Sequence, residues 1–345
     1  MRISFGGGGT DMPGYYRAYA GAVLSAAINK YFYTVVSRRA DDQVQIISSD
    51  FRLIETWENL DDLPEVSHPL ALPIAVMRQA GKISGANFFL ASEIPPGTGL
   101  GSSGSVCVNL VKATRLLQGL SADRGQLAET AYYIARERLR KPVGKQDEYA
   151  AAFGGLNFIR FERDDSVAVT PVDLPAPALR ELQGSLLLFF TGVSHDSWKI
   201  LKQQEQVSGD GLQALHDIRQ LADAMYQALL QADFRRFGEL LDLSWQRKRA
   251  LSSQISTPDI DSYYAAARAA GAGGGKITGA GGGGYLLLYA QPSAQPAVRA
   301  ALRAEGLREM PFAFDFHGTR VIANDPFLDS DRRSGLRWRL ELAAG

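Results

Sequence analysis

The chain has 345 residues, 46% of them hydrophobic and 21% charged, which is typical of a globular protein large enough for two domains. Lys plus Arg and Asp plus Glu number 37 each, so no net charge recruits nucleic acid or an anionic membrane, and small molecules are the expected partners. The single cysteine, Cys107, excludes an intramolecular disulfide, and no long apolar stretch or signal peptide is evident. We therefore expect a cytoplasmic protein, either a monomer or a homodimer.

The segment Arg2–Asp11 is typical of a short strand that ends in a run of glycines. Glycines let a ligand contact the backbone, and the Thr-Asp pair that follows offers a hydroxyl and a carboxylate, which are groups that hold sugar hydroxyls. The alternative is a hairpin loop in which the aspartate caps a turn or a helix. The candidate substrate-binding residues are Gly8, Gly9, Thr10 and Asp11.

Further strands are expected within residues 22–37, 43–50 and 85–91, and helical periodicity predicts a helix at 72–82. The last of these strands leads into a stretch rich in glycine and serine, after which apolar residues recur at helical spacing up to Leu117. The order is therefore strand, glycine-rich turn and helix.

This turn is a candidate anion-binding loop. Its glycines let an anion approach the backbone, and Ser102 and Ser103 stand where a helix begins, beside the positive end of the helix dipole. Ser102 replaces the third glycine of the dinucleotide fingerprint, and the Gly-Lys of the Walker loop is missing. A connection that uses glycine only to turn is the alternative. The candidate nucleotide-binding residues are Pro96, Gly97, Gly99, Leu100, Gly101, Ser102, Ser103, Gly104 and Ser105.

Residues 123–139 have helical periodicity, and a proline and a glycine end this helix before Lys145–Tyr149. Phosphoryl transfer to a hydroxyl needs a carboxylate as base and a further acidic group for magnesium beside the nucleotide. We expect Asp147, in the loop, to be the base and Glu137, on the helix, to converge on it; both could instead be surface caps. Lys145 could lower the pKa of Asp147, contact phosphate, or be a solvated lysine.

The second half opens with an apolar run that predicts a buried strand, and we place the boundary between domains 1–180 and 181–345 in the proline-bearing connection before it. A last strand is expected at Phe312–Val321. The Arg-rich tail at 332–339 could dock, dimerise or be a solvated end. Helices are expected at residues 196–207, 211–231, 233–253, 258–270 and 293–305.

A second glycine-rich string, Gly273–Gly284, leads into the predicted strand Tyr285–Tyr289. Flexible linkers are also rich in glycine, but they do not embed Lys-Ile-Thr or end in an apolar strand. A linker remains the alternative to a functional segment.

These motifs resemble those of the GHMP kinases, the family of galactokinase, homoserine kinase, mevalonate kinase and phosphomevalonate kinase. The resemblance implies an α+β fold, with an N-terminal domain similar to domain 2 of ribosomal protein S5 and a ferredoxin-like C-terminal domain, and a site between them that binds ATP and Mg2+. The matching strings are Pro-Pro-Gly-x-Gly-Leu-Gly-Ser-Ser at 95–103, Arg2–Asp11, Glu137-Arg138 with Gly144–Asp147 and Gly154-Gly155, and Gly-Ala-Gly-Gly-Gly-Gly at 279–284.

The resemblance also implies roles for individual residues. Arg2 falls on the arginine that assists the base Asp147, and Ser103 and Glu137 fall on the magnesium ligands. The third motif is expected to pack against the nucleotide loop, with Gly281 and Gly282 toward the nucleotide and Gly283 toward the substrate.

Within the family the first string is similar to that of heptose and heptose-phosphate kinases, whereas galactokinase-like members carry Glu-His where this chain has Gly8-Gly9. The resemblance implies phosphorylation of the anomeric hydroxyl of D-glycero-D-manno-heptose 7-phosphate, a step toward nucleotide-activated heptose. Ser194 and His195 match a Thr-Gly-x-Ser-Arg string and are expected to bind the terminal phosphate, although Ser194 could only cap a helix. A kinase of another sugar, such as an octose phosphate or a fucose-like sugar, and a catalytically silent sugar or nucleotide sensor remain alternatives.

Overall fold

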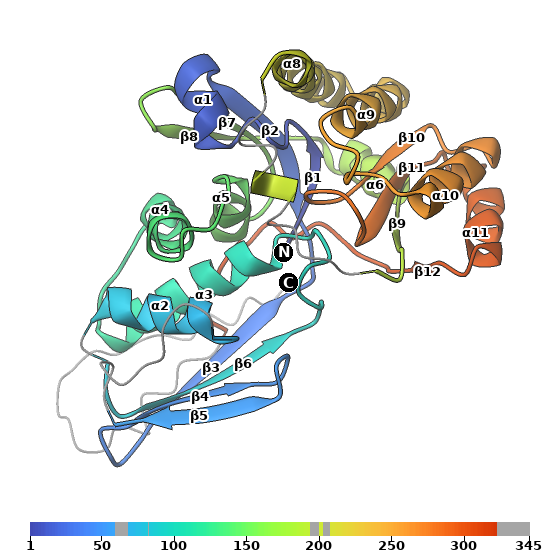
Figure 1. Cartoon of the computed structure of the whole chain (residues 1–345). Helices are drawn as coiled ribbons and strands as arrows, with labels where there is room; N and C mark the ends of the chain where they lie inside the picture. Colours follow the sequence, from blue (N-terminus) through green and yellow to red (C-terminus); the bar gives the residue numbers. More distant parts are fainter. Residues whose placement is uncertain (59–67, 82, 194–199, 203–207, 323–345) are drawn as a thin grey trace.

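Strand β1 (Arg2–Gly6) forms one edge of an antiparallel four-stranded sheet of order β1-β2-β7-β8. Its register with β2 (Gly21–Ala27) shifts between Ser4 and Gly6, where the first glycine run begins. The sheet is completed by β7 (Leu156–Phe161) and β8 (Val167–Pro171). The computed structural model in Figure 1 describes residues 1–58, 68–81, 83–193, 200–202 and 208–322.

A second four-stranded sheet has the order β3-β6-β4-β5, in which only the pairing of β4 with β6 is parallel. Four helices pack between this sheet and the first one, and they share a core that includes Phe88, Val108 and Phe161 (Figure 1). The strands are β3 (Phe32–Arg38), β4 (Val44–Ser48), β5 (Leu53–Trp57) and β6 (Ala86–Ser92), and the helices are α2 (Ala71–Ala80), α3 (Ser102–Leu117), α4 (Arg124–Tyr133) and α5 (Gln146–Phe153).

The third four-stranded sheet, of order β10-β11-β9-β12, is antiparallel and belongs to the second half of the chain. One face packs with α8 and α9 against the first sheet, and the other face is covered by α10 and α11 (Figure 1). The elements are β9 (Leu186–Phe190), α8 (Asp210–Leu230), α9 (Phe234–Arg249), α10 (Pro258–Ala269), β10 (Gly274–Ile277), β11 (Tyr285–Tyr289), α11 (Gln295–Ala304) and β12 (Arg308–Glu309).

The strands of the first two sheets end at Pro171 and those of the third begin at Leu186, which brackets the expected division near residue 180. Helix α6 (Ala176–Gly184) joins the two halves. One apolar core holds Phe5 from the first half together with Leu188 and Phe237 from the second. The halves therefore meet through buried apolar side chains, which hold any site between them in a fixed geometry.

The expected last strand, Phe312–Val321, is wrong. The last strand within residues 208–322 is β12, and there Phe314 makes only an isolated bridge to Ile28. The Asp315 N–H donates to Ala27 O at 2.9 Å and the Tyr31 hydroxyl donates to the Asp315 carboxylate at 2.6 Å. The apolar alternation of this segment thus serves packing against the first half rather than a sheet. The helices α1 (Pro13–Tyr19) and α6 were not predicted, and most of 196–207 lies outside the described residues, as does the tail at 332–339.

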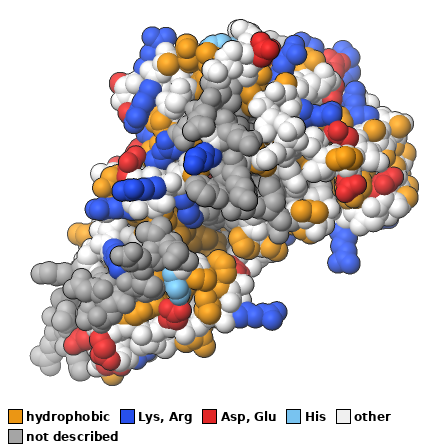
Figure 2. All heavy atoms as spheres, in the orientation of Figure 1, with side chains coloured by type: hydrophobic (Ala, Val, Ile, Leu, Met, Phe, Trp, Pro, Cys, Tyr) orange, Lys and Arg blue, Asp and Glu red, His pale blue; other side chains and the backbone are white. Residues whose placement is uncertain are grey.

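No helix in the ranges that the structure describes is both long and apolar enough to cross a membrane. On the face shown in Figure 2, Lys and Arg side chains alternate with Asp and Glu, as the balanced composition predicts. The chain thus presents no field of a single sign on this face.

Candidate active site

A cavity of about 660 Å³ lies where the two glycine-rich strings meet the helix layer. The first half supplies most of its wall, including the glycine loop before α3 and the start of α5. From the second half, the described residues that line it are Leu201, Lys248, Gly279 and Ala280. The cavity therefore collects the loop, the predicted base and the third glycine segment in one place.

The glycine loop has the geometry of an anion cradle. Gly97, Gly99 and Gly101 have φ values of 76°, 80° and 70°, a region that favours glycine. Gly101 is the N-cap of the 16-residue helix α3, and Ser102 and Ser103 of its first turn line the cavity. The free N–H groups and the positive end of the helix dipole thus face the cavity, as anion binding requires.

The second glycine string packs directly on this loop. A Cβ at Gly99 would lie 2.4 Å from Thr278 O, one at Gly279 would lie 2.4 Å from Gly99 Cα, and one at Gly284 would lie 2.3 Å from Thr98 O. Side chains at these positions would separate the two strings, so glycine is needed on both sides. Gly279 and Ala280 line the cavity, whereas Gly281, Gly282 and Gly283 do not.

Asp147 lies within hydrogen-bonding distance of Arg2. The Arg2 Nε donates to Asp147 Oδ1 at 2.8 Å, Nη2 lies 2.6 Å from the same oxygen, and Nη1 donates to Gly99 O at 2.6 Å. Arg2 is buried, whereas the Asp147 side chain keeps 29% of its surface exposed toward the cavity. The carboxylate is therefore oriented by a fixed cation and still accessible to a ligand.

Asp147 belongs to helix α5 and not to a loop, which corrects the expectation from the sequence. Gly104 of α3 allows this helix to approach, because a Cβ there would lie 2.7 Å from Asp147 Cβ. A Cβ at Gly101 would lie 3.3 Å from Asp147 Cγ. The base candidate consequently sits directly against the anion cradle.

Asp11 forms the other side of the site and is buried. Its Oδ1 accepts from Gly9 N at 3.0 Å and from Gln146 Nε2 at 3.1 Å, and its Oδ2 accepts from Gln146 N at 3.3 Å. Burial raises the pKa of Asp11, and the nearby Asp147 raises it further, while the N–H donors oppose the shift. Asp11, Gly8 and Gly9 line the cavity. The aspartate is thus held rigidly at a distance from which it affects the base.

Lys145 does not reach the site. Its Nζ donates to Glu129 Oε1 at 2.8 Å and to Asp165 O at 2.9 Å, and it lies over the rings of Tyr132 and Tyr16. Because a helix turns by about 100° per residue, Lys145 and Asp147 point to different sides at the start of α5. The expected influence of Lys145 on the base or on phosphate has no support in this arrangement.

Three other predicted residues serve the scaffold. The Thr10 hydroxyl donates to Gly7 O at 2.7 Å and accepts from Ala22 N at 3.1 Å, so it ties the glycine run to β2. Leu100 is buried in the core between the halves, and the Ser105 hydroxyl donates to Gly101 O at 3.0 Å. None of the three lines the cavity, although Pro96, Gly97 and Gly104 beside them do.

The two predicted magnesium ligands are not brought together. Ser103 lines the cavity, but Glu137 is exposed on the π-helix η2 (Ile134–Arg138), and the cavity face of this segment is formed by Ala135 and Leu139. The extra residue of a π-turn changes which side chains face inward, a shift that helical periodicity does not reveal. Among the described residues there is also no group of three or more His, Cys, Asp or Glu arranged to hold a metal.

Glu148 is a functional candidate that the sequence did not reveal. It lines the cavity with only 3% of its surface exposed, and its Oε2 has no hydrogen-bond partner among the described residues. Burial raises the pKa of Glu148 well above its usual value, and Asp147 adds to this effect. A magnesium ion with a nucleotide needs only one or two carboxylates, because phosphate oxygens and water supply the rest. Ser103 and Glu148 fit that requirement.

Lys248 and Lys276 were also missed. Lys248 continues the buried face of α9 after Leu241 and Trp245, at the spacing of an apolar stripe, and this position on the stripe is the only sequence signal. Its Nζ donates to Gly279 O, and burial lowers its pKa to about 8, with a smaller contribution from Arg2. Lys276 is equally buried, donates to Phe5 O at 3.2 Å, and has a lowered pKa mainly because of burial.

Many of the residues that line the cavity on the side of the second sheet are apolar. The wall there is built from the second sheet and the helices over it, and it includes Phe32, Leu70, Leu72, Leu90, Ile94 and Val106. An apolar slot that adjoins a phosphate cradle suits the flat base of a nucleotide.

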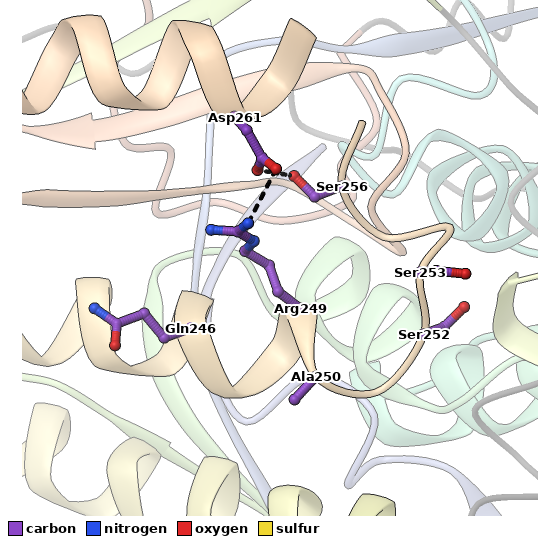
Figure 3. A pocket seen from close by; sticks show the side chains of 7 residues that line it. All are labelled: Gln246, Arg249, Ala250, Ser252, Ser253, Ser256 and Asp261. Atoms are coloured by element: carbon purple, nitrogen blue, oxygen red, sulfur yellow. Dashed lines mark hydrogen bonds and ion pairs between the residues drawn. The ribbon is translucent and has the colours of Figure 1, made fainter. Parts of the chain in front are cut away.

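A second hollow, of about 360 Å³, lies between the end of α9 and the start of α10 (Figure 3). Its wall is polar, with Arg249 Nη2 3.0 Å from Asp261 Oδ2 and the Ser256 hydroxyl donating to Asp261 Oδ1 at 2.6 Å. The loop behind it supports the second glycine string, because Gly282 N donates to Ile255 O at 2.7 Å. Its role is therefore structural support. Ser194 and His195 lie outside the described residues.

Comparison with protein families gives two matches in chain order. The model of the GHMP kinases N terminal domain matches residues 70–155, and that of the GHMP kinases C terminal matches residues 215–307. The first match contains the glycine loop and Asp147, and the second contains Lys248 and the second glycine string.

Proteins that are similar to nearly the whole chain include kinases. The D-glycero-alpha-D-manno-heptose 7-phosphate kinase of Campylobacter jejuni is 31% identical over 93% of this chain and 96% of its own length. A solved D-glycero-D-manno-heptose 1-phosphate kinase from Bacteroides thetaiotaomicron superposes with a TM-score of 0.77 at 27% identity, covering 94% of this chain and 98% of its own. A solved putative sugar kinase from Campylobacter jejuni has a TM-score of 0.75 at 30% identity, covering 92% and 94%.

Proposed function

Because the chain belongs to the GHMP kinase family and is an enzyme of the kinase class, we propose that it transfers the terminal phosphoryl group of ATP to the anomeric hydroxyl of D-glycero-D-manno-heptose 7-phosphate. The observation that carries the proposal is the placement of Asp147, which Arg2 holds between the anion cradle and Asp11. The heptose specificity rests on the Campylobacter jejuni relative and on the glycines that stand in place of Glu-His.

The position of the nucleotide follows from the chemistry of its phosphates and its base. Its phosphates lie on the glycine loop at the start of α3, and its base occupies the apolar side of the cavity. Magnesium, when bound with the nucleotide, neutralises charge on the phosphates. Ser103 and Glu148 are the residues of this chain that would hold it.

The sugar occupies the side of the cavity at Gly8, Gly9 and Asp11. There Asp147 accepts the proton of the anomeric hydroxyl, and Arg2 orients the carboxylate. In phosphoryl transfer most of the acceleration comes from positioning and electrostatics, so the fixed pair of Arg2 and Asp147 matters through its orientation as much as through its basicity. A catalytically silent sensor would have no need for this pair.

The terminal phosphate of the sugar would bind at Thr191–His195, after β9. Thr191, the first residue of this segment, is anchored by its hydroxyl, which donates to Gly284 O at 2.9 Å, so the start of the segment is tied to the second glycine string. A glycine turn followed by a helix start can bind a phosphate through its N–H groups.

The test is to compare kcat/KM on the heptose with kcat/KM on its 7-phosphate. A charge-assisted anchor contributes about 2 to 3 kcal/mol, so the phosphorylated sugar should be favoured by roughly 30- to 150-fold. A product phosphorylated at the anomeric position, identified by its phosphorus coupling, completes the test. Equal efficiency on both sugars, or preference for the free sugar, would move the enzyme to the free-sugar kinases.

A further inference from the structure

Lys248 is the only cationic side chain that the described part of the second half contributes to the cavity wall. It is 5% exposed, and the partner of its Nζ is the carbonyl oxygen of Gly279. Burying an ammonium group that has only a carbonyl partner is costly, and proteins tolerate this cost mainly where the charge has a use.

Within the described residues, the buried ammonium groups beside the cavity lack a direct carboxylate partner. Arg2 is paired with Asp147, and Asp11 is held by N–H donors, while Lys248 and Lys276 form no ion pair among the residues described. Arg2 and Lys276 both lie close enough to Lys248 to repel its charge. A dianionic group in the adjoining cavity would supply the missing negative charge.

The position of Lys248 indicates which dianionic group would bind beside it. The Gly279 carbonyl that it contacts belongs to the residue that packs against Gly99, and Arg2 Nη1 donates to Gly99 O. One cation from each half of the chain therefore contacts this pair of packed glycines, Arg2 at Gly99 and Lys248 at Gly279. Lys248, the glycine loop and Asp11 line the same cavity, and Lys248 lies close enough to Asp11 to interact with it electrostatically.

We propose that Lys248 contacts the phosphoryl group that passes from nucleotide to sugar. This inference rests on the proposed kinase function and assigns a catalytic residue in the second half. In the step, the sugar oxygen forms a bond to the terminal phosphorus, and the bond from that phosphorus to the bridging oxygen breaks. The electron pair leaves with the nucleoside diphosphate, and the hydroxyl proton goes to Asp147. Lys248 donates hydrogen bonds to oxygens of the group in transit.

The decisive measurement compares two nucleotides on the full-length chain in the presence of magnesium, by calorimetry. ADP lacks the transferred group, and the β,γ-imido analogue of ATP carries it. Lys248→Met should weaken binding of the analogue by about 10- to 100-fold, which is the value of a hydrogen bond to a charged group, and should leave ADP affinity within about twofold. Lys248→Arg should retain most of the preference for the analogue.

Arg249→Met is the matched control. Arg249 follows Lys248 on the same helix, but its side chain turns to Asp261 in the second hollow and not to the cavity (Figure 3). Arg249→Met thus removes one positive charge from the residue next to Lys248 and leaves the cavity wall unchanged. Affinity for both nucleotides and turnover should stay within about twofold of the wild type, because exposed ion pairs contribute little.

A second readout is the pH profile. The buried Lys248 has a pKa of about 8, so kcat/KM of the wild type should decline above that pH as the ammonium loses its proton. Arg2, Asp11 and Lys276 face the same group, but the guanidinium of Lys248→Arg stays charged. In that variant the decline should move to higher pH.

Other outcomes overturn the proposal. An equal loss for ADP and the analogue would make Lys248 a support for the glycine loop. Unchanged affinity for both nucleotides, with a raised KM for the sugar, would assign it to the acceptor. If thermal melting shows that Lys248→Met is unfolded, Lys248→Gln takes its place as the uncharged variant and is compared with Lys248→Arg. Failure of the wild type to phosphorylate any sugar would refute the proposed function separately, while the ratio of nucleotide affinities would still test Lys248.

Discussion

The first half of the chain offers the cavity backbone N–H groups and carboxyl groups, whereas the second half offers one buried ammonium group and a glycine string that touches the loop. The N–H groups of Gly97–Ser103 are fixed by helix α3 and by glycines of positive φ. Lys248 and Gly279, in contrast, come into place only when α9 and β10 pack against β1. One half is preorganised locally and the other by tertiary packing.

This difference predicts how each half fails. Changes in the first half should act on single steps, nucleotide binding or proton transfer, because each group there has its own support. Changes in the second half should act on the transferred group, where the halves meet. The Lys248 variants test the second half, and the substitutions below test the first half, in order of decreasing effect on catalysis.

Asp147→Asn should reduce kcat by about 100-fold or more and leave ATP affinity within about threefold. The amide keeps the shape of the carboxylate and can still meet Arg2, but it cannot accept the hydroxyl proton. Steady-state kinetics with calorimetric ATP binding checks both parts. Near-normal turnover would remove Asp147 from the mechanism.

Gly101→Val should weaken nucleotide binding by at least about 30-fold, since it disturbs both the cradle and the cation beside it. A Cβ there would lie 3.1 Å from Arg2 Cγ and 3.3 Å from Asp147 Cγ, and φ is 70°. Gly119→Val is the control, because Gly119 has the same φ of 70° but nothing within 4 Å of its Cβ position. It should cost about 1 to 2 kcal/mol of stability and leave nucleotide affinity unchanged. Equal effects of the two variants on affinity would reduce the loop to a turn.

Both glycine strings could be predicted from the sequence because they depend on local backbone geometry. Glycine at fixed spacing before a helix, or before an apolar strand, specifies a cradle whatever surrounds it. The pairing of Arg2 with Asp147 was also predicted, through the resemblance of their motifs to those of the GHMP kinases. The contact between Gly99 and Gly279 then follows from the same lack of side chains.

Side-chain direction could not be predicted in the same way. The helix α5 begins at Gln146, one residue before Asp147, and this start turns Lys145 away and brings Glu148 in. The π-turn in η2 similarly places Ala135 rather than Glu137 on the cavity face. Both outcomes depend on a shift of a single residue at a helix end, where periodicity is least informative.

Glu148→Gln should raise the magnesium concentration needed for half-maximal turnover by about tenfold, because the amide replaces a buried carboxyl group whose Oε2 has no hydrogen-bond partner among the described residues. Glu137→Gln, on the exposed face of η2, should change it by less than about twofold. Affinity for ADP with and without magnesium gives a readout that is independent of turnover. The reverse ranking would show that the sequence assignment of Glu137 was correct.

Lys145→Met should have the smallest effect on catalysis, with kcat within about threefold of the wild type, because the ammonium group faces Glu129 and Asp165 rather than the cavity. The substitution should instead lower the stability of the folded protein. The Asp165 carbonyl loses a donor and the Tyr149 hydroxyl remains as the partner of Glu129, so the free energy of unfolding should fall by about 1 to 3 kcal/mol in denaturant titration. Glu129→Gln, which keeps an acceptor for both partners, should cost less. A loss of turnover greater than tenfold with unchanged stability would return Lys145 to the active site and would mean that the start of α5 rotates when the nucleotide binds.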